Sequence, residues 1–304
     1  MGGPAGRSGD LSHVSTRKLV ILLNPSAAGG RAARLLPEAR RELEALGLSH
    51  RVVETRDMAH ASQAAKEVAD DETVVAMGGD GLVGALAAAV RGRSPLGVLP
   101  AGRGNDFARE LKIPFDIPGA SRVLAEGTER ALDLGEANGQ PFICIASTGF
   151  DSEANRIANE ARFIKGNLVY AYAALRALIS WRRARFELKL DGQAHALEGY
   201  TVVAANTRFY GGGMRVAPGA IPTDGILEVV LIGQTSKLRF LSNLPKVFSA
   251  KHVDLEPVKV FHAREVEIAA NRPFDVYADG EVLTRLPATV RLIPEAVRVI
   301  APST

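Results

Sequence analysis

The stretch Thr73-Val74-Val75-Ala76-Met77-Gly78-Gly79-Asp80-Gly81-Leu82-Val83-Gly84 decides how the first half of the chain folds. An apolar run of strand length leads into glycines and then into a segment of helical composition. Glycines at such a junction let the backbone approach a phosphate closely, and the N–H groups at the positive end of the next helix attract it. The stretch therefore predicts a nucleotide-phosphate site at the end of a strand.

Strand and helix patterns alternate on both sides of this stretch. Apolar runs of strand length occur at Arg17–Leu23, Arg51–Thr55, Thr73–Met77 and Leu96–Leu99. Segments of helical composition lie between them at Arg31–Leu46, Ala59–Ala69 and Leu82–Val90. This alternation predicts an α/β domain with a doubly wound, mostly parallel sheet.

The second half of the chain has a different pattern. Short β-like runs occur at Phe142–Ser147, Phe186–Leu190, Tyr200–Ala205, Ile226–Ile232, Val258–Ile268 and Phe274–Tyr277. Asp191-Gly192 and Asp279-Gly280 are hairpin signals, because both turn positions must tolerate a positive φ. We therefore expect a mainly antiparallel second domain, with helices at about 151–183 and 236–249.

Four segments follow from these patterns. We expect a disordered polar leader over residues 1–16 and the α/β nucleotide-binding domain over 17–136. The β-rich domain should cover 137–286, and a C-terminal segment, 287–304, should return towards the first domain.

Composition and charge exclude several classes of protein. With 304 residues, 37 Lys and Arg against 34 Asp and Glu give a net charge of +3, so no nucleic-acid partner is expected. The single cysteine, Cys144, lies in an apolar run and excludes an intramolecular disulfide, which fits a reducing cytosol. The leader lacks the apolar core of a secretion signal. The apolar segment Leu168–Trp181 is shorter than the roughly 20 residues of a membrane span, so we expect a cytoplasmic protein.

Asp80 separates two interpretations of the glycine-rich stretch. Gly79-x-Gly81-x-x-Gly84 also fits the dinucleotide-binding fingerprint of oxidoreductases, but it follows the third strand instead of the first. A carboxylate beside a polyphosphate is unfavourable unless a divalent cation lies between them. We therefore interpret Asp80 as a magnesium-side carboxylate, and a plain glycine turn in which Asp80 caps the helix remains the alternative.

Two further strand ends in the same half are polar and rich in glycine. Asn24-Pro25-Ser26-Ala27-Ala28-Gly29-Gly30 follows the first strand, and Leu99–Arg109 follows the fourth. Ligands of open parallel sheets bind beyond the carboxyl ends of the strands, so three such ends should meet at one crevice. No Walker-type loop, nucleophile elbow or metal-ligand spacing of histidines is found, which disfavours P-loop NTPases, α/β-hydrolases and zinc hydrolases.

Taken in order, these motifs match one family. Gly78-Gly79-Asp80-Gly81 followed by Pro100–Arg109, with Asn24-Pro25 before and Asp279-Gly280-Glu281 after, resembles the soluble diacylglycerol kinases, a family that includes sphingosine and ceramide kinases. The resemblance runs from about Arg17 to Pro302. It implies a lipid kinase that uses ATP and Mg²⁺, with ATP in a cleft between the α/β domain and a β-sandwich domain. Diacylglycerol is the first-choice acceptor and phosphatidic acid the product.

The resemblance also assigns residues by position. It places at the nucleotide Asn24, Pro25, Ser26, Gly29, Thr55, Gly78, Gly79, Asp80, Gly81, Leu82, Gly84, Arg103, Asn105 and Asp106. It implies that Asp80 is catalytic and that the general base is Asp279 or Glu281, although Asp279-Gly280 also suits a plain hairpin.

A metal-linked set of residues is implied as well. By position, Asp133 belongs to an acidic, magnesium-linked network that reaches the cleft. Asp224 matches a metal-binding turn in which the backbone carbonyls of Ile221 and Ile226 contribute.

The chain departs from the family pattern at three places, and alternatives remain. Leu82 stands where threonine is common, Gly84-Ala85 where Asn or His and Glu are usual, and Arg103 where threonine or serine is frequent. An NAD kinase, which normally carries Asn-Glu near Gly84, is the alternative enzyme, and a non-catalytic lipid- or nucleotide-binding relative is the other.

A lipid acceptor implies a membrane as partner. We expect peripheral contact with the inner face of the membrane, for which Trp181 with Arg182 and Arg183 is a candidate. A core-packed helix is the alternative for that segment. The oligomeric state is left open, a homodimer included.

Overall fold

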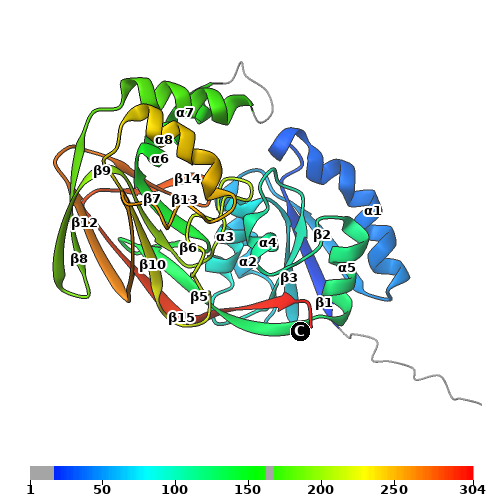
Figure 1. Cartoon of the computed structure of the whole chain (residues 1–304). Helices are drawn as coiled ribbons and strands as arrows, with labels where there is room; N and C mark the ends of the chain where they lie inside the picture. The colour runs from blue at the N-terminus through cyan, green and yellow to red at the C-terminus, as the bar shows by residue number, and fades with distance from the viewer. Residues whose placement is uncertain (1–16, 162–167, 304) are drawn as a thin grey trace, which may run out of the picture.

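The computed structural model describes residues 17–161 and 168–303. The leader expected for residues 1–16 therefore lies outside the described residues. Figure 1 shows an α/β domain on one side and a β-rich domain on the other, which confirms the fold class expected from the sequence. Within the described residues, no helix is both long and apolar enough to cross a membrane.

The first domain is built on a parallel sheet of order β2-β1-β3-β4. Its strands are β1 (Lys18–Leu23), β2 (Ser49–Glu54), β3 (Glu72–Gly78) and β4 (Leu96–Pro100). Its helices are η1 (Ala27–Gly29), α1 (Arg31–Ala45), α2 (Met58–Lys66), α3 (Asp80–Ala89), α4 (Asp106–Glu110) and α5 (Ile117–Glu126). Strands β1, β3 and β4 are apolar and almost wholly buried, because helices cover the sheet on both faces. Since the four strands run in the same direction, their carboxyl ends lie at one edge.

The second domain is an antiparallel sheet with helices packed on it. Its strands are β5 (Thr128–Ala137), β6 (Gln140–Phe142), β7 (Ile145–Gly149), β8 (Ala184–Leu190), β9 (Gln193–Ala205), β10 (Leu227–Gly233), β11 (Val258–Ala263), β12 (Glu265–Ala270), β13 (Asp275–Ala278), β14 (Glu281–Arg285) and β15 (Ala288–Ala301). Its helices are α6 (Phe150–Glu160), α7 (Leu168–Ser180), α8 (Lys237–Asn243) and η2 (Leu244–Val247). The sequence analysis did not identify α5 or the long strand β5.

Both predicted Asp-Gly hairpins are confirmed. Asp191 and Gly192 join β8 to β9 with φ values of 48° and 84°. Asp279 and Gly280 join β13 to β14 with φ values of 52° and 92°. Two consecutive positive φ values are what a two-residue hairpin turn requires, and aspartate and glycine tolerate them.

Two runs that the sequence presents as single strands are broken in the structure. The run Val258–Ile268 is interrupted at Arg264, whose backbone N–H donates to the Asp191 carboxylate instead of to a strand. The run Phe142–Ser147 is interrupted at Ile143 and Cys144, so Cys144 is buried as expected but lies between strands. The backbone N–H groups of Ile143 and Cys144 are thereby free to bond a side chain.

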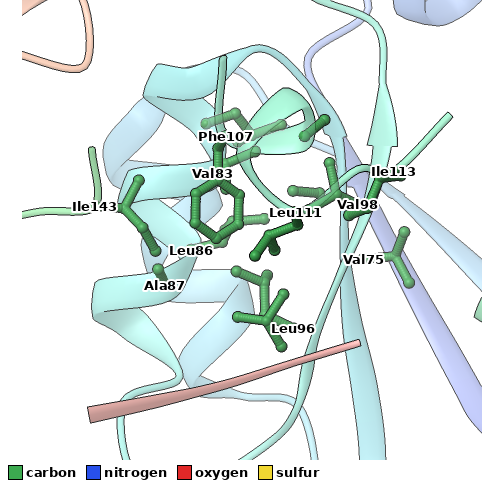
Figure 2. Packing of buried hydrophobic residues seen from close by; sticks show 14 of the residues in the cluster. Val75, Val83, Leu86, Ala87, Leu96, Val98, Phe107, Leu111, Ile113 and Ile143 are labelled. Atoms are coloured by element: carbon green, nitrogen blue, oxygen red, sulfur yellow. The ribbon is translucent and has the colours of Figure 1, made fainter. Parts of the chain in front are cut away.

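A hydrophobic interface fixes the two domains relative to one another. Ile143 belongs to the same buried cluster as the side chains of α3 and β4. Figure 2 shows Leu86 and Ala87 of α3 with Ile143 on one side and Leu96 on the other. β15 adds a second connection, because it pairs with β5 and β12 and also runs parallel to β4 at Val299 and Leu96. The start of α3 therefore has a fixed position against the second domain.

Candidate active site

The loops that follow β1 and β2 are bonded to each other. Asn24 Oδ1 accepts hydrogen bonds from the Ser26 N–H (3.0 Å) and the Ser26 hydroxyl (2.8 Å). Asn24 Nδ2 donates to the Arg56 carbonyl at 3.1 Å, and the Thr55 hydroxyl donates to the Leu23 carbonyl at 3.1 Å. Asn24 and Thr55 therefore shape one wall at the carboxyl edge of the sheet, where ligands of such sheets bind.

The glycine loops that follow β3 and β4 touch through their backbones. A Cβ atom on Gly102 would overlap the Cα atom of Gly79, so only glycine fits there. Asn105, at a φ of 53°, holds the Gly102 loop from the other side: its Oδ1 accepts from the Gly102 N–H (2.9 Å) and its Nδ2 donates to the Gly102 carbonyl (3.2 Å). Asn105, expected at the nucleotide, thus turns towards its own loop.

A cavity of about 220 Å³ lies between these loops and the β13–β14 hairpin. The expected site residues that line it are Asn24, Thr55, Gly78, Gly79, Gly81, Leu82, Asp279 and Glu281. The lining residues that the sequence analysis missed are Ala27, Ala32, Asp57, Met58, Met77 and Ala101. The expected nucleotide residues that do not line it are Pro25, Ser26, Gly29, Asp80, Gly84, Arg103, Asn105 and Asp106. A larger hollow of about 560 Å³ lies beside Trp181 in the second domain, away from the glycine loops.

Asp80 is the first residue of α3, where a negative charge is favourable. Its Oδ1 accepts from the Phe107 N–H at 2.9 Å, which ties α3 to α4. A Cβ atom on Gly104 would lie 3.2 Å from Asp80 Oδ2 and 3.1 Å from Asp106 Oδ2, so both carboxylates face the same glycine. The structure therefore brings Asp80 and Asp106 together.

Asp106 is a buried carboxylate reached from the second domain. Its Oδ2 accepts from the Gly212 N–H at 2.7 Å. Its Oδ1 accepts no hydrogen bond from the described part of the chain and lies 3.7 Å from Arg109 Nε. Burial raises the pKa of Asp106, the Gly212 hydrogen bond lowers it, and the charge of Asp80 raises it further.

Asp279 enters the site from the β13–β14 turn. Its Oδ2 accepts from the Ile143 N–H (2.8 Å) and its Oδ1 from the Cys144 N–H (3.0 Å), the two groups freed by the break between β6 and β7. Burial raises its pKa to about 7; the two hydrogen bonds oppose the shift and the charge of Asp80 adds to it. Its Oδ2 lies over Gly84 of α3, where a Cβ atom would come within 2.6 Å.

Glu281, the other acidic residue of this hairpin, lies at the start of β14. Its side chain is exposed and lines the cavity opposite Gly81. Asp279 therefore forms the hairpin turn and also directs its carboxylate at α3, and its role as a general base stays a prediction. A carboxylate whose pKa lies near 7 is suited to act as a general base.

Asn206, which the sequence analysis did not identify, holds the segment that binds Asp279. Its Nδ2 donates to the carbonyls of Asp133 (3.0 Å) and Ile143 (2.9 Å), and its backbone N–H donates to the Cys144 carbonyl at 2.9 Å. It thereby orients the segment whose N–H groups hold Asp279. The available signal was a polar residue directly after the apolar strand β9.

The structure joins Asp133 to the turn at 221–226. Asp133 Oδ2 accepts from the Gly225 N–H at 2.7 Å, and Oδ1 accepts from the Glu295 N–H at 2.9 Å. Within the turn, Asp224 Oδ1 accepts from the Ile226 N–H at 2.9 Å and the Ile221 carbonyl accepts from the Thr223 N–H at 2.8 Å. In residues 17–161 and 168–303, no group of three or more His, Cys, Asp and Glu could hold a metal ion. The metal role of this turn stays a prediction.

The remaining residues expected at the nucleotide lie in the loops that follow β1 and β4. Pro25, Ser26 and Gly29 belong to the β1–α1 connection, and Arg103 is exposed in the loop after β4. Arg31, which the sequence analysis missed, joins the two loops: its Nη1 donates to the Gly102 carbonyl at 3.0 Å.

Comparison with known proteins finds a matching family model for each of the two domains. A family model described as the diacylglycerol kinase catalytic domain matches residues 18–137, and one described as the YegS C-terminal NAD kinase β-sandwich-like domain matches residues 144–301. A protein named diacylglycerol kinase from Mycobacterium tuberculosis is 34% identical over 308 residues, which cover 97% of this chain and 98% of that protein. One of the same name from Bacillus subtilis is 27% identical and covers 93% of this chain and 95% of its own length.

Solved structures show the same fold. A diacylglycerol kinase from Bacillus anthracis superposes with a TM-score of 0.73 at 21% identity, covering 94% of this chain and 96% of that one. An NAD kinase from Archaeoglobus fulgidus in complex with ATP gives a TM-score of 0.50 at 12% identity, covering 95% and 94%. The first is the closer in fold of these two. Two family models match the two domains, and a diacylglycerol kinase is 34% identical over 97% of this chain. The chain therefore belongs to the diacylglycerol kinase family.

Proposed function

We propose that the protein transfers the γ-phosphoryl group of ATP, with Mg²⁺, to the hydroxyl group of diacylglycerol and so forms phosphatidic acid. One observation carries the proposal. The Asp279 carboxylate of the second domain, with a pKa raised to about 7 by burial, faces the start of α3 beside the glycine-lined cavity of the first domain. A base and a phosphate site thus meet where an acceptor hydroxyl would need both.

The glycine loops suit the phosphates of ATP. Gly78 and Gly79 lead into the N-terminus of α3, whose free N–H groups and dipole favour an anion. Asn105 and Arg31 hold the neighbouring Gly102 loop in place, so the backbone is arranged before the nucleotide binds. Such preorganisation lowers the cost of binding.

Asp80 and Asp106 are suited to hold Mg²⁺. The Oδ2 atoms of both carboxylates face Gly104, and the buried Oδ1 of Asp106, 3.7 Å from Arg109 Nε, accepts no hydrogen bond from the described residues. Mg²⁺ is usually bound by one or two carboxylates together with substrate phosphates. When bound, the ion would offset the negative charge of the phosphates.

Asp279 would take the proton of the acceptor. The lipid O–H bond breaks as the oxygen bonds to the γ-phosphorus, the bond from that phosphorus to the β-phosphate oxygen breaks, and the proton passes to the Asp279 carboxylate and then to solvent. General-base assistance of this kind is worth about 10²–10⁴-fold in rate. Ile143 and Cys144 N–H groups keep the carboxylate oriented during the step.

The choice of acceptor rests on the relatives. Those from Mycobacterium tuberculosis and Bacillus subtilis are named diacylglycerol kinases. The NAD kinase from Archaeoglobus fulgidus is similar in fold alone, and NAD is therefore the second acceptor to be tested.

Incubation with labelled ATP and Mg²⁺ tests the proposal. Diacylglycerol, sphingosine and NAD are supplied separately, and we expect label to enter diacylglycerol alone and only when Mg²⁺ is present. Asp80→Ala should abolish the labelling while circular dichroism shows an unchanged fold. Label in NAD or sphingosine alone would overturn the acceptor, and full activity of Asp80→Ala would overturn the role of Asp80.

A further inference from the structure

Helices α7 and α8 lie side by side at one end of the second domain (Figure 1). Lys237 Nζ donates to the Ile179 carbonyl at 2.8 Å and so joins the start of α8 to the end of α7. Ala173 and Ala177 of α7 and Phe240 of α8 are buried together against the second domain. Each helix therefore has one buried face and one outer face.

The outer faces carry large apolar side chains that are exposed. Of the nine large apolar side chains exposed in the described residues, four lie on these helices, namely Leu175, Ile179, Leu238 and Leu241. A fifth, Phe248, directly follows η2. Ile179 is 71% exposed and Leu238 82% exposed. Leu175 and Ile179 are four residues apart on α7, and Leu238 and Leu241 are three apart on α8, so each pair shares a face of its helix. We call these five residues and the cations around them the α7–α8 surface.

The two chain segments that carry these residues contain charge of one sign. Segments 168–183 and 234–251 contain no aspartate or glutamate, and they hold seven of the 37 Lys and Arg. These exposed cations are Arg176, Arg182, Arg183, Lys237, Arg239, Lys246 and Lys251. The remaining 30 cations and 34 acidic residues leave the rest of the chain with a net charge of −4. The basic excess of the protein is thus concentrated on the α7–α8 surface.

Trp181, which the sequence analysis suggested for membrane contact, packs against the second domain instead. Its ring stacks on Tyr200 and on Phe274, with centroids 5.8 Å apart in each case, and Arg272 lies 4.7 Å from its centre. Trp181 therefore anchors the end of α7 to the second domain. The apolar side chains available for contact are those of the α7–α8 surface.

We propose that the α7–α8 surface docks the protein on an anionic phospholipid bilayer. The five apolar side chains would enter the headgroup region while the seven cations approach the lipid phosphates, since long basic side chains tolerate that boundary. A protein partner fits less well, because protein interfaces are depleted in lysine and three of the seven cations are lysines. The negative remainder of the chain would be repelled by the same bilayer, which orients the molecule. This inference deepens the proposed function, since it names the source of the lipid acceptor.

Vesicle sedimentation without ATP tests the docking. The full chain is mixed with vesicles of phosphatidylcholine alone or of phosphatidylcholine with phosphatidylglycerol, and we expect tighter binding to the anionic vesicles that weakens as salt is added. Ile179→Gln with Leu238→Gln should lower the affinity by about ten-fold or more, because apolar burial is lost. Arg239→Gln with Lys246→Gln should lower it by a similar factor, since each cation near an anionic surface contributes about five-fold.

The matched control removes two exposed cations from the first domain. Arg40→Gln with Arg41→Gln on α1 changes the net charge equally and should leave vesicle binding unchanged. The proposal is overturned if the control weakens binding as much as the α8 pair, or if neutral and anionic vesicles bind alike. It is also overturned if Ile179→Gln with Leu238→Gln converts a dimer into a monomer in gel filtration, because the surface would then join two copies of the chain.

A separate assay distinguishes this proposal from the proposed function. With a water-soluble short-chain diacylglycerol, the variants of the α7–α8 surface should keep their activity, since no bilayer is needed. A wild-type chain that binds anionic vesicles but phosphorylates no lipid would refute the proposed function and leave the docking intact. Surface variants that lose activity on the soluble acceptor would overturn the assignment of this surface to docking.

Discussion

The ionisation of Asp279 should govern the pH dependence of catalysis. Its pKa is raised from 3.8 to about 7, chiefly by burial, so the carboxylate gains and loses its proton near neutral pH. We expect kcat/KM to rise from about pH 5 to about pH 9 with a midpoint near 7, and to lose this dependence in Asp279→Asn. Glu281→Gln should keep the midpoint. A profile that is flat in the wild type, or that disappears in Glu281→Gln instead, would contradict the assignment of Asp279.

The same pKa has a consequence for stability, with the opposite sign. Because the folded state binds the Asp279 proton more tightly than the unfolded chain does, the protonated residue favours folding below about pH 3.8. This contribution is lost as the pH rises through about 7. The base form that the reaction needs is therefore the less stable one.

Gly84 leaves room for the Asp279 carboxylate, so replacing Gly84 should lower the activity of the enzyme. Glycine inside a helix costs roughly 0.5–1 kcal/mol relative to alanine, so Gly84→Ala would stabilise α3 if the space were free. A Cβ atom there would instead lie 2.6 Å from Asp279 Oδ2. We expect kcat to fall by about 100-fold, as for a misplaced reacting group, with the KM for ATP nearly unchanged.

The double variant Gly84→Ala with Asp279→Asn provides the control for this prediction. If Gly84 acts through Asp279, the double variant should be no slower than Asp279→Asn alone, because coupled sites are not additive. Additive losses would mean that Gly84 affects the reaction by another route.

Among the elements, the loop between β4 and α4 is held by the Asn105 side chain. Asn105→Gly keeps the left-handed backbone and removes the two buried hydrogen bonds to Gly102. We expect a loss of about 1–2 kcal/mol of stability and a raised KM for ATP, as the Gly102 loop is released. Asn105→Asp, which keeps the acceptor for the Gly102 N–H, should raise the KM less. Thermal unfolding and initial rates measure both, and an unchanged KM in Asn105→Gly would contradict the role of the loop.

The elements also show what local sequence patterns could and could not predict. The first apolar run, expected at Arg17–Leu23, is β1 at Lys18–Leu23 in the structure. The helical segment expected at Arg31–Leu46 is α1 at Arg31–Ala45. The pattern of β1 suffices because burial on both faces leaves an unbroken apolar run in the sequence. The break between β6 and β7 at Ile143 and Cys144 is not visible in the sequence pattern. Both residues are apolar and buried, as strand residues would be, although their N–H groups donate to Asp279.

In the candidate site, the sequence motifs pointed to individual carboxylates but not to the groups that form hydrogen bonds with them. Asp80 and Asp279 stand out because their motifs are local. The donor to Asp279 is 136 positions away in the sequence, and it is a backbone group, which every residue carries. Asn206 likewise acts through carbonyls of distant residues, so only the folded chain shows its role.

At the scale of the whole molecule, an ion pair with a buried carboxylate joins the two domains. Glu110 of α4 accepts from the Arg208 backbone N–H (2.9 Å) and from its guanidinium at Nε (3.0 Å). The Glu110 side chain is 4% exposed and the Arg208 side chain 32% exposed, so removing Glu110 leaves a guanidinium that is only partly hydrated. We expect Glu110→Ala to lower the free energy of unfolding by about 3 kcal/mol, measured by urea denaturation.

Two further variants check the cause of that loss. Glu110→Ala with Arg208→Ala should cost less than the sum of the single changes, since no charge is then left unpaired. Lys18→Ala, which breaks the exposed pair with Asp71, should have no measurable effect. Equal losses from the buried and the exposed pair would contradict the argument.

The last strand of the molecule bears on how it is made in the cell. β15 supplies the neighbour of β4 in the first domain and of β5 and β12 in the second. Until residues 288–301 have been synthesised, the backbone groups along those edges have no partner, and exposed strand edges favour aggregation. The nucleotide loops of the first domain are therefore synthesised well before the strand that covers the outer edge of β4.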